Sequence, residues 1–294
     1  MRRLLSTVLV VLVALLTPLS AVAVWGDREI GDTDRFVATM APLSSDPAVR
    51  NAVAERVTDE VLKNVDVGPF QDSVRGFVRQ AVTSFTDSAA FRTAWDAVNR
   101  EGHSALDRSL SSDSDEPVTL DLAPVTQQVK DQLVADGQPF AQAIPVTHTR
   151  ITVVEPEKLG GLRTTFRWLR VGGVWLPVAT VVLTLAALVL SVRRARTLAG
   201  LGLAFAVGGA LLRAGVAVAR ATTLGDLPSD VDPAAARAVY DQLTATLSTT
   251  AWVLLGAGAV LAVAGWFTDR SRRGRTVAPG RPPAPREAAR QARS

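Results

Sequence analysis

Hydrophobic residues are concentrated in four long runs along the 294-residue chain, one at its start and three in its second half. The runs are Leu4–Trp25, Val171–Val192, Thr197–Ala219 and Thr249–Thr268. A helix rises about 1.5 Å per residue, so about 20 apolar residues are enough to cross the hydrocarbon core of a bilayer. The pattern therefore predicts a membrane α-helical bundle of four spans, with a sizeable segment, residues 26–170, outside the membrane.

In the first half of residues 26–170, apolar positions recur with the period of a helix. Asp46-Pro47 is a cap followed by proline at the first helical position, and a valine recurs every fourth residue after it. A more regular amphipathic face runs from Phe70 to Phe85, and a third helix begins near Ser88 with Trp95 on its apolar side. We expect these three helices to pack on one another through their apolar faces.

The period then changes to two, because Val118, Leu120 and Leu122 alternate with polar or small residues, which indicates a strand. A helix from Pro124 and a second strand over residues 147–154 follow. This order predicts a small α/β unit with a right-handed crossover inside a mainly α domain. A last helix starts at Glu155-Pro156 and is expected to run directly into the second span.

The distribution of charge predicts the orientation, because basic residues next to spans are retained in the cytoplasm. With the N-terminus inside, the cytoplasmic parts hold 13 basic and 2 acidic residues, and the outer parts hold 18 basic and 26 acidic residues. Both termini are therefore expected to be cytoplasmic, with residues 26–170 extracytoplasmic. An outer loop, residues 220–248, would join the third and fourth spans.

The first run has two interpretations. Arg2-Arg3, an apolar core and a small-residue Ala21-Val22-Ala23 sequence describe a cleavable signal peptide. The same residues describe a signal anchor, and apolarity that continues to Trp25 favours this second reading. Either outcome places the following segment outside.

Composition excludes several classes of site. The chain has no cysteine, so disulfides, thiol chemistry and zinc-thiolate sites are absent. The tail, residues 269–294, interleaves eight arginines with four prolines and is expected to be disordered on the cytoplasmic side. Anionic lipids are its expected partner, and with no aromatic residue in the tail no nucleic-acid binding is predicted.

Several short motifs occur together in the chain. They are Asp32–Thr39, Asp46–Val49, Trp95 with Asn99, Arg100 and His103, and Leu120–Pro124. With these motifs the chain resembles a family of actinobacterial integral membrane proteins that have an N-terminal span, an extracytoplasmic domain and three C-terminal spans. The resemblance implies this topology and assigns no activity.

Two places in the sequence carry polar residues with a candidate role. Asn99, His103 and Asp107 are spaced one helical turn apart, as in a ligand-binding or pH-sensitive cluster or in a structural network that fixes the helix. Arg213 is the one charge inside a predicted span, which indicates either a functional site or pairing with an outer-loop aspartate or lipid phosphate. It falls on the same helix stripe as Gly202 and Gly209, which predicts close-packed neighbours.

Other candidates carry little signal. The acidic residues Asp113, Asp115 and Glu116 lack the glycine and terminal glutamate of a calcium loop. His148 has no partner at zinc spacing, and Ser104 beside His103 is not a nucleophile arrangement. No catalytic residue, metal or cofactor is therefore expected.

The sequence leaves more than one function open. The leading expectation is a non-enzymatic protein of the cell membrane that binds, senses or scaffolds through its extracytoplasmic domain, with an envelope protein as partner. A homo-oligomer would fit the small residues of the spans. The alternatives are a transport or channel component that uses Arg213 and, more weakly, a cell-envelope enzyme.

Overall fold

The structure is a computed structural model that describes residues 2–63, 70–111, 118–121, 123–135, 137, 142, 145–146, 148, 150–154, 156–191 and 194–274. Helices dominate these residues. Their bounds are α1 Arg2–Trp25, α2 Thr33–Met40, α3 Pro47–Lys63, α4 Gln71–Thr86, α5 Ala89–Ser111, α6 Ala123–Ala135, α7 Pro156–Val189, α8 Arg194–Gly225 and α9 Pro233–Gly274. A π-helical turn, η1, covers Gly26–Ile30, and a 3₁₀ turn, η2, covers Ala41–Ser45.

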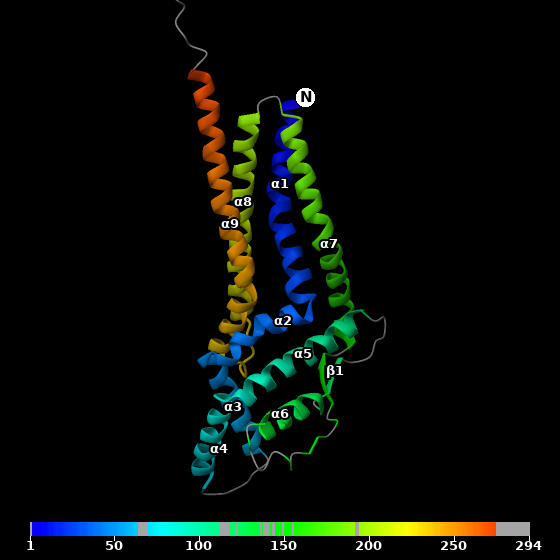
Figure 1. The fold of residues 1–294 in the computed structure, drawn as a ribbon, viewed down its shortest axis with the longest axis vertical. Helices are drawn as coiled ribbons and strands as arrows, with labels where there is room; N and C mark the ends of the chain where they lie inside the picture. Colours follow the sequence, from blue (N-terminus) through cyan, green and yellow to red (C-terminus); the bar gives the residue numbers. More distant parts are fainter. Residues whose placement is uncertain are drawn as a thin grey trace, which may run out of the picture.

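Four of these helices are long and apolar enough to cross a membrane, as the sequence predicts. The spans are Thr7–Ile30, Arg167–Val189, Ala195–Gly225 and Pro233–Thr268, which makes the chain a multi-pass membrane protein. They stand side by side, with the N-terminus, the α7–α8 turn and the end of α9 at one end of the bundle (Figure 1). The other described helices form a helical domain at the opposite end (Figure 1).

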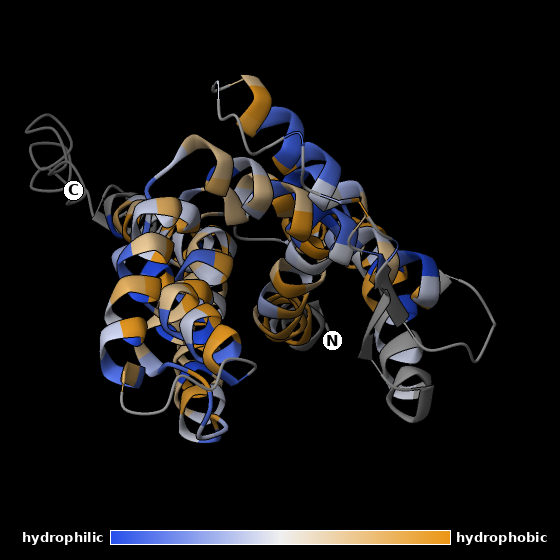
Figure 2. Ribbon diagram, turned by 90° about the horizontal axis from the view of Figure 1, so that it is seen from below, coloured by the Kyte–Doolittle hydropathy of each residue, from blue (hydrophilic) through white to orange (hydrophobic). Residues whose placement is uncertain are grey.

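The bundle is built around close contacts between small residues. A Cβ added to Gly258 of α9 would lie 2.4 Å from the backbone nitrogen of Ala206 on α8, and one added to Gly202 of α8 would lie 2.3 Å from the nitrogen of Ala262 on α9. Glycine is therefore what lets these two helices touch. α1 lies between this pair and α7, and its Val13 is fully buried (Figure 1). α1 is orange along most of its length where Figure 2 views it end-on beside the N mark.

The core of the helical domain forms where α2, η2, α3 and α5 meet. Asp46 caps α3 by accepting hydrogen bonds from the backbone nitrogens of Ala48 and Val49, and Pro47 occupies the first helical position. Trp95 of α5 packs against the buried Met40 and donates its indole N–H to the Met40 carbonyl over 2.9 Å. Figure 2 shows the domain helices with mixed blue and orange residues, as expected for half-exposed helices.

The segment expected as an outer loop is largely helical. α8 continues to Gly225 and α9 begins at Pro233. Asp232 caps α9 by accepting a hydrogen bond from the Ala235 nitrogen over 2.7 Å, the same Asp-Pro device that starts α3. The first turns of α9 then join the core of the helical domain through Ala235, Ala238, Val239 and Leu243. The sequence predicted a span over Thr249–Thr268 that follows a loop, whereas α9 is one helix that begins in the domain at Pro233 and continues through the membrane.

The amphipathic face of α4 is not packed inward as predicted. Phe70 just before the helix is 69% exposed and Phe77 is 74% exposed. α4 pairs with α3 at the end of the domain that lies farthest from the bundle, and of its apolar face Phe85 meets Phe91 of α5, so this face is covered only in part (Figure 1). Helical periodicity reports which face is apolar, and it does not report what covers that face.

The expected α/β crossover unit is not supported. Two short strands, β1 Val118–Asp121 and β2 Arg150–Val154, pair antiparallel, with Leu120 opposite Ile151. A right-handed crossover requires parallel strands. An alternating pattern carries no strand direction, and α6 between them packs on α5. As predicted, α7 runs from just after β2 through the membrane without a break.

Candidate functional site: a groove between the membrane helices and the helical domain

A groove of about 500 Å³ runs along the bundle, from the end nearest the helical domain to the level of Leu185 and Phe205. One face of α1 forms its floor, with residues one turn apart, and α7 and α9 form its two walls, joined by Phe205 of α8. The wall and floor residues are Thr17, Ser20, Ala21, Val24, Trp25, Pro177, Thr180, Val181, Thr184, Leu185, Thr246, Thr250 and Leu254. A volume of this size lies within the range of about 300–1,000 Å³ that is typical of small-molecule sites.

The groove is apolar although several of its residues carry hydroxyls. Thr17, Thr180, Thr184 and Thr250 each donate a hydrogen bond to the carbonyl oxygen four residues earlier in the same helix, over 2.7–2.8 Å. These bonds satisfy the hydroxyl hydrogens within the helix. The side chains therefore offer mainly methyl and methylene groups to the groove, which suits a hydrocarbon ligand.

The groove opens at η1 and α2, where three charged residues border it: Arg28, Glu29 and Arg35. Glu29 accepts a hydrogen bond from the Thr39 hydroxyl over 3.0 Å, so one of its oxygens is already engaged. Both arginines are exposed, and no ion pair joins either guanidinium to any residue that the structure describes. The mouth of the groove therefore carries two unpaired cations and one partly satisfied carboxylate.

Polar contacts hold the membrane helices together at this end. The Trp25 indole N–H donates to the Leu243 carbonyl over 3.0 Å, which ties the floor of the groove to α9. Arg220 of α8 forms two hydrogen bonds with Asp241 of α9, over 2.8 and 2.9 Å, and the Tyr240 hydroxyl donates to the Val216 carbonyl. A two-fold guanidinium–carboxylate contact fixes geometry better than a single one. The groove is therefore bordered by helices with a defined spacing.

His103 joins α5 to the same junction. His103 is buried, with 7% of its surface exposed. Its Nε2 lies 2.7 Å from the Ile30 carbonyl oxygen, and its Nδ1 lies 3.0 Å from the Thr33 hydroxyl. Because a carbonyl only accepts, Nε2 carries the hydrogen and donates it. The ring also stacks on Phe36, with centroids 4.5 Å apart. His103 thus fixes α5 to the chain that leaves η1 and enters α2, beside the mouth of the groove.

The predicted polar cluster on α5 is not a connected network. Asn99 donates to the carbonyl of Trp95 on its own helix, and one buried carboxylate oxygen of Asp107 has no hydrogen-bond partner within the described part of the chain. His103 instead bonds to residues about 70 positions earlier. The hydrogen-bond partners of His103 therefore lie on the η1–α2 link and not on its own helix.

The surface of α5 carries a second link to α2. Arg100 pairs with Asp34 across the two helices. Burial raises the pKa of the neighbouring Asp96 above its ordinary value, and the nearby Arg100 charge opposes that shift only in part. α5 and α2 are therefore joined inside the domain, at His103 and Trp95, and also at its surface, at Arg100.

Arg213 does not face the close-packed neighbours that its helix stripe predicts. Gly202 and Gly209 on that stripe pack against α9, whereas Arg213 is exposed and does not border the groove. No ion pair joins Arg213 to Asp226, Asp230, Asp232 or Asp241, the expected partners, within the part of the chain that the structure describes; Asp230 pairs with Arg56, and Asp241 with Arg220. Arg213 projects from the outer surface of the bundle, the position from which an arginine can extend toward lipid headgroups.

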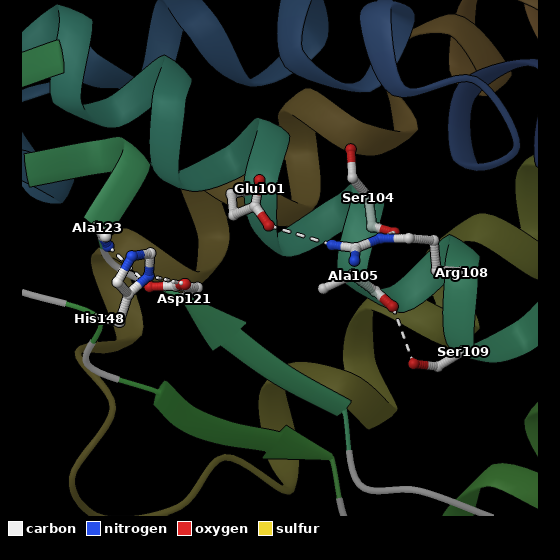
Figure 3. Close-up of polar contacts among 8 residues, drawn as sticks. All are labelled: Glu101, Ser104, Ala105, Arg108, Ser109, Asp121, Ala123 and His148. Carbon is white, nitrogen blue, oxygen red and sulfur yellow. Dashed lines mark hydrogen bonds and ion pairs between the residues drawn. The ribbon is translucent and has the colours of Figure 1, made fainter. Parts of the chain in front are cut away.

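The remaining candidates lie away from the groove. His148 is 78% exposed and lies 2.7 Å from Asp121, whose other oxygen accepts from the Ala123 nitrogen at the start of α6 (Figure 3). On the adjacent helix Arg108 bonds to Glu101 and to the Ser104 carbonyl (Figure 3). No group of three metal-binding side chains occurs among the residues that the structure describes. Asp113, Asp115 and Glu116, and the tail from residue 275 on, lie outside the described residues.

Comparison with known proteins adds no assignment. No family model, no curated protein and no solved structure matches this chain. Any role for the groove and its junction with the helical domain must therefore be argued from the structure of this chain.

Arg28 and Arg35 were not singled out by the sequence. Arg28 follows the first apolar run within one turn of Trp25, and Arg35 follows two turns later. A basic residue just beyond a span is a common feature, so these positions alone indicate no site. They become notable only because η1 turns the chain and brings both to the open end of a groove.

Proposed function

We propose that this protein is a non-enzymatic binding protein of the cell membrane, which holds a membrane-borne ligand in the groove and couples its presence to the helical domain. The observation that carries the proposal is that the floor and walls of the groove continue into the domain. α1 leads through η1 into α2, α7 begins beside β2, and the first turns of α9 form part of the domain core. A ligand that changes the spacing of these helices acts directly on the domain.

We also propose that the domain is extracytoplasmic and both termini are cytoplasmic. The support is the excess of basic residues near the termini and in the α7–α8 turn, which lie at one end of the bundle. The groove would then open at the outer surface of the membrane. The resemblance to actinobacterial membrane proteins implies the same arrangement.

The proposal requires that α1 stays in the mature protein. α1 forms the groove floor, and its fully buried Val13 belongs to the bundle core. Cleavage after Ala23 would remove both. Intact-mass measurement of the purified protein is expected to find residues 2–23 present, and a mature chain that starts at Val24 would rule out this floor.

Neighbouring residues on α9 provide a matched test of binding. Thr250 borders the groove and Thr249 does not, and each hydroxyl donates to the carbonyl four residues earlier. A tryptophan at position 250 fills the groove, whereas one at position 249 points away from it. We expect native mass spectrometry in mild detergent to detect one retained phosphatidylglycerol on the wild type and on Thr249→Trp, and none on Thr250→Trp.

The same variants test coupling. A ligand that binds the folded protein raises its unfolding temperature. Added phosphatidylglycerol should therefore raise the thermal midpoint of the wild type and Thr249→Trp, and leave that of Thr250→Trp unchanged. Equal lipid retention by all three proteins would refute the groove as the binding site.

A transport role through Arg213 receives no support from its position. Its side chain is exposed and is not part of the groove. We therefore do not place a permeation path at this residue.

A further inference from the structure

We propose that the ligand in the groove is an anionic lipid whose phosphate headgroup is bound by Arg28 and Arg35. The inference rests on the proposed function and adds the chemical class of the ligand. It places the acyl chain along the floor of α1 and the headgroup at η1 and α2.

The charges at the mouth favour an anion. Of the charged residues that border the groove, two are arginines without an ion pair in the described part of the chain and one is Glu29. The hydrogen bond from Thr39 directs one Glu29 oxygen toward α2. A guanidinium has five N–H donors in a plane that match two oxygens of a phosphate, and two such groups can share one headgroup.

The interior favours one hydrocarbon chain. Thr17, Thr180, Thr184 and Thr250 have their hydroxyl hydrogens bonded within their own helices, so a chain beside them displaces no required hydrogen bond. Aliphatic and aromatic side chains complete the lining, among them Val24, Leu185 and Phe205. A free inorganic anion would leave this apolar surface in contact with water, whereas a lipid covers it and also satisfies the arginines.

The position of the groove fits a ligand that enters from the bilayer. Trp175 is exposed on α7, two residues before the wall residue Pro177. Indole rings prefer the region of the lipid headgroups, so Trp175 marks that level on α7. Pro177 is the groove residue of α7 nearest the domain, so the headgroup level lies at the open end of the groove.

The test compares two lipids that share a phosphate and differ in the group attached to it, a neutral glycerol or a cationic choline. Phosphatidylglycerol and phosphatidylcholine with identical acyl chains are titrated onto the full-length protein in neutral detergent, and binding is measured by native mass spectrometry. The double variant R28Q/R35Q removes both cations. R167Q/R237Q is the matched control, because it removes two exposed arginines of α7 and α9 that do not border the groove.

We expect the wild type to bind phosphatidylglycerol about tenfold more tightly than phosphatidylcholine, the change that one charge-assisted hydrogen bond produces. In R28Q/R35Q the preference should be lost, because the affinity for phosphatidylglycerol falls further than that for phosphatidylcholine, and the control should keep the preference. Inorganic phosphate at millimolar concentration should not displace the lipid.

Three results would overturn the inference. They are equal affinities in the wild type, a preference that survives in R28Q/R35Q, and displacement of the lipid by phosphate alone. If Thr250→Trp still abolishes binding of both lipids, the groove remains a lipid site and only the headgroup assignment fails. A dimer that dissociates on the Thr250→Trp substitution would instead show that a second copy fills the groove.

Discussion

At the scale of single residues, His103 holds the domain to the membrane helices. It bonds to the Ile30 carbonyl and the Thr33 hydroxyl, and its ring stacks on Phe36, so three contacts converge on one buried side chain. Asn99 on the same helix bonds only to its own backbone. Substitutions at these two residues therefore compare the loss of a contact between elements, at His103, with the loss of a contact within one helix, at Asn99.

Replacing His103 should destabilise the protein strongly. His103→Ala leaves the Ile30 carbonyl without its donor and opens a cavity beside Phe36, which together should cost about 2–4 kcal/mol. Asn99→Ala should cost less than about 1 kcal/mol, because its bond lies within α5. Thermal unfolding of both variants in detergent measures the difference. A midpoint for His103→Ala equal to that of the wild type would refute the structural role.

The sequence located His103 and missed its partners for a physical reason. Helical spacing relates residues within one helix, so it suggested Asn99 and Asp107. The observed partners lie in the link from η1 to α2, and only the packing of α5 on α2 brings them close. Arg28 and Arg35 were missed for the same reason, since their proximity depends on the turn at η1.

At the scale of elements, the contact of α8 with α9 depends on glycine. Gly258 touches the backbone of Ala206, whereas a Cβ on Gly256, two residues earlier, would meet nothing within 4 Å. Gly258→Leu should separate the two helices and lower the thermal midpoint by several degrees, while Gly256→Leu should change it little. Unfolding of the two variants side by side checks this. Equal midpoints would mean that α8 and α9 do not touch along this face.

Some elements followed from the sequence and others did not. The Asp46-Pro47 start of α3 and the four spans were predicted, because a cap and a long apolar run are local signals. The direction of β2 and the exposure of Phe77 were not, because both depend on what lies opposite. Asp232-Pro233 is the same local signal for the start of α9. It was not used, because residues 220–248 were interpreted as a loop.

At the scale of the whole molecule, orientation can be measured directly because the chain has no cysteine. Ser84 is exposed on α4 in the domain, and Arg270 is exposed near the end of α9. A membrane-impermeant maleimide should label Ser84→Cys in intact cells and should label Arg270→Cys only after permeabilisation. The reverse pattern would place the domain in the cytoplasm and the groove at the inner surface.

The groove itself is a property of the assembled molecule. Each of its walls is an ordinary apolar helix face in the sequence, and the space exists only where faces of α1, α7, α8 and α9 come together. The length and apolarity of the spans could predict a bundle. These two properties could not predict the groove, because hydropathy does not determine how one helix packs against another.

The most direct test of the account is to map where a lipid contacts the bundle. A phosphatidylglycerol with a diazirine in its acyl chain is added at one equivalent to the detergent-solubilised protein, and crosslinked peptides are identified after irradiation. A lipid bound in the groove should give adducts on the groove faces, at Ala21, Thr180 and Thr250. Adducts spread over the exposed outer faces, at Val182, Leu203 and Val253, with none in the groove, would contradict it.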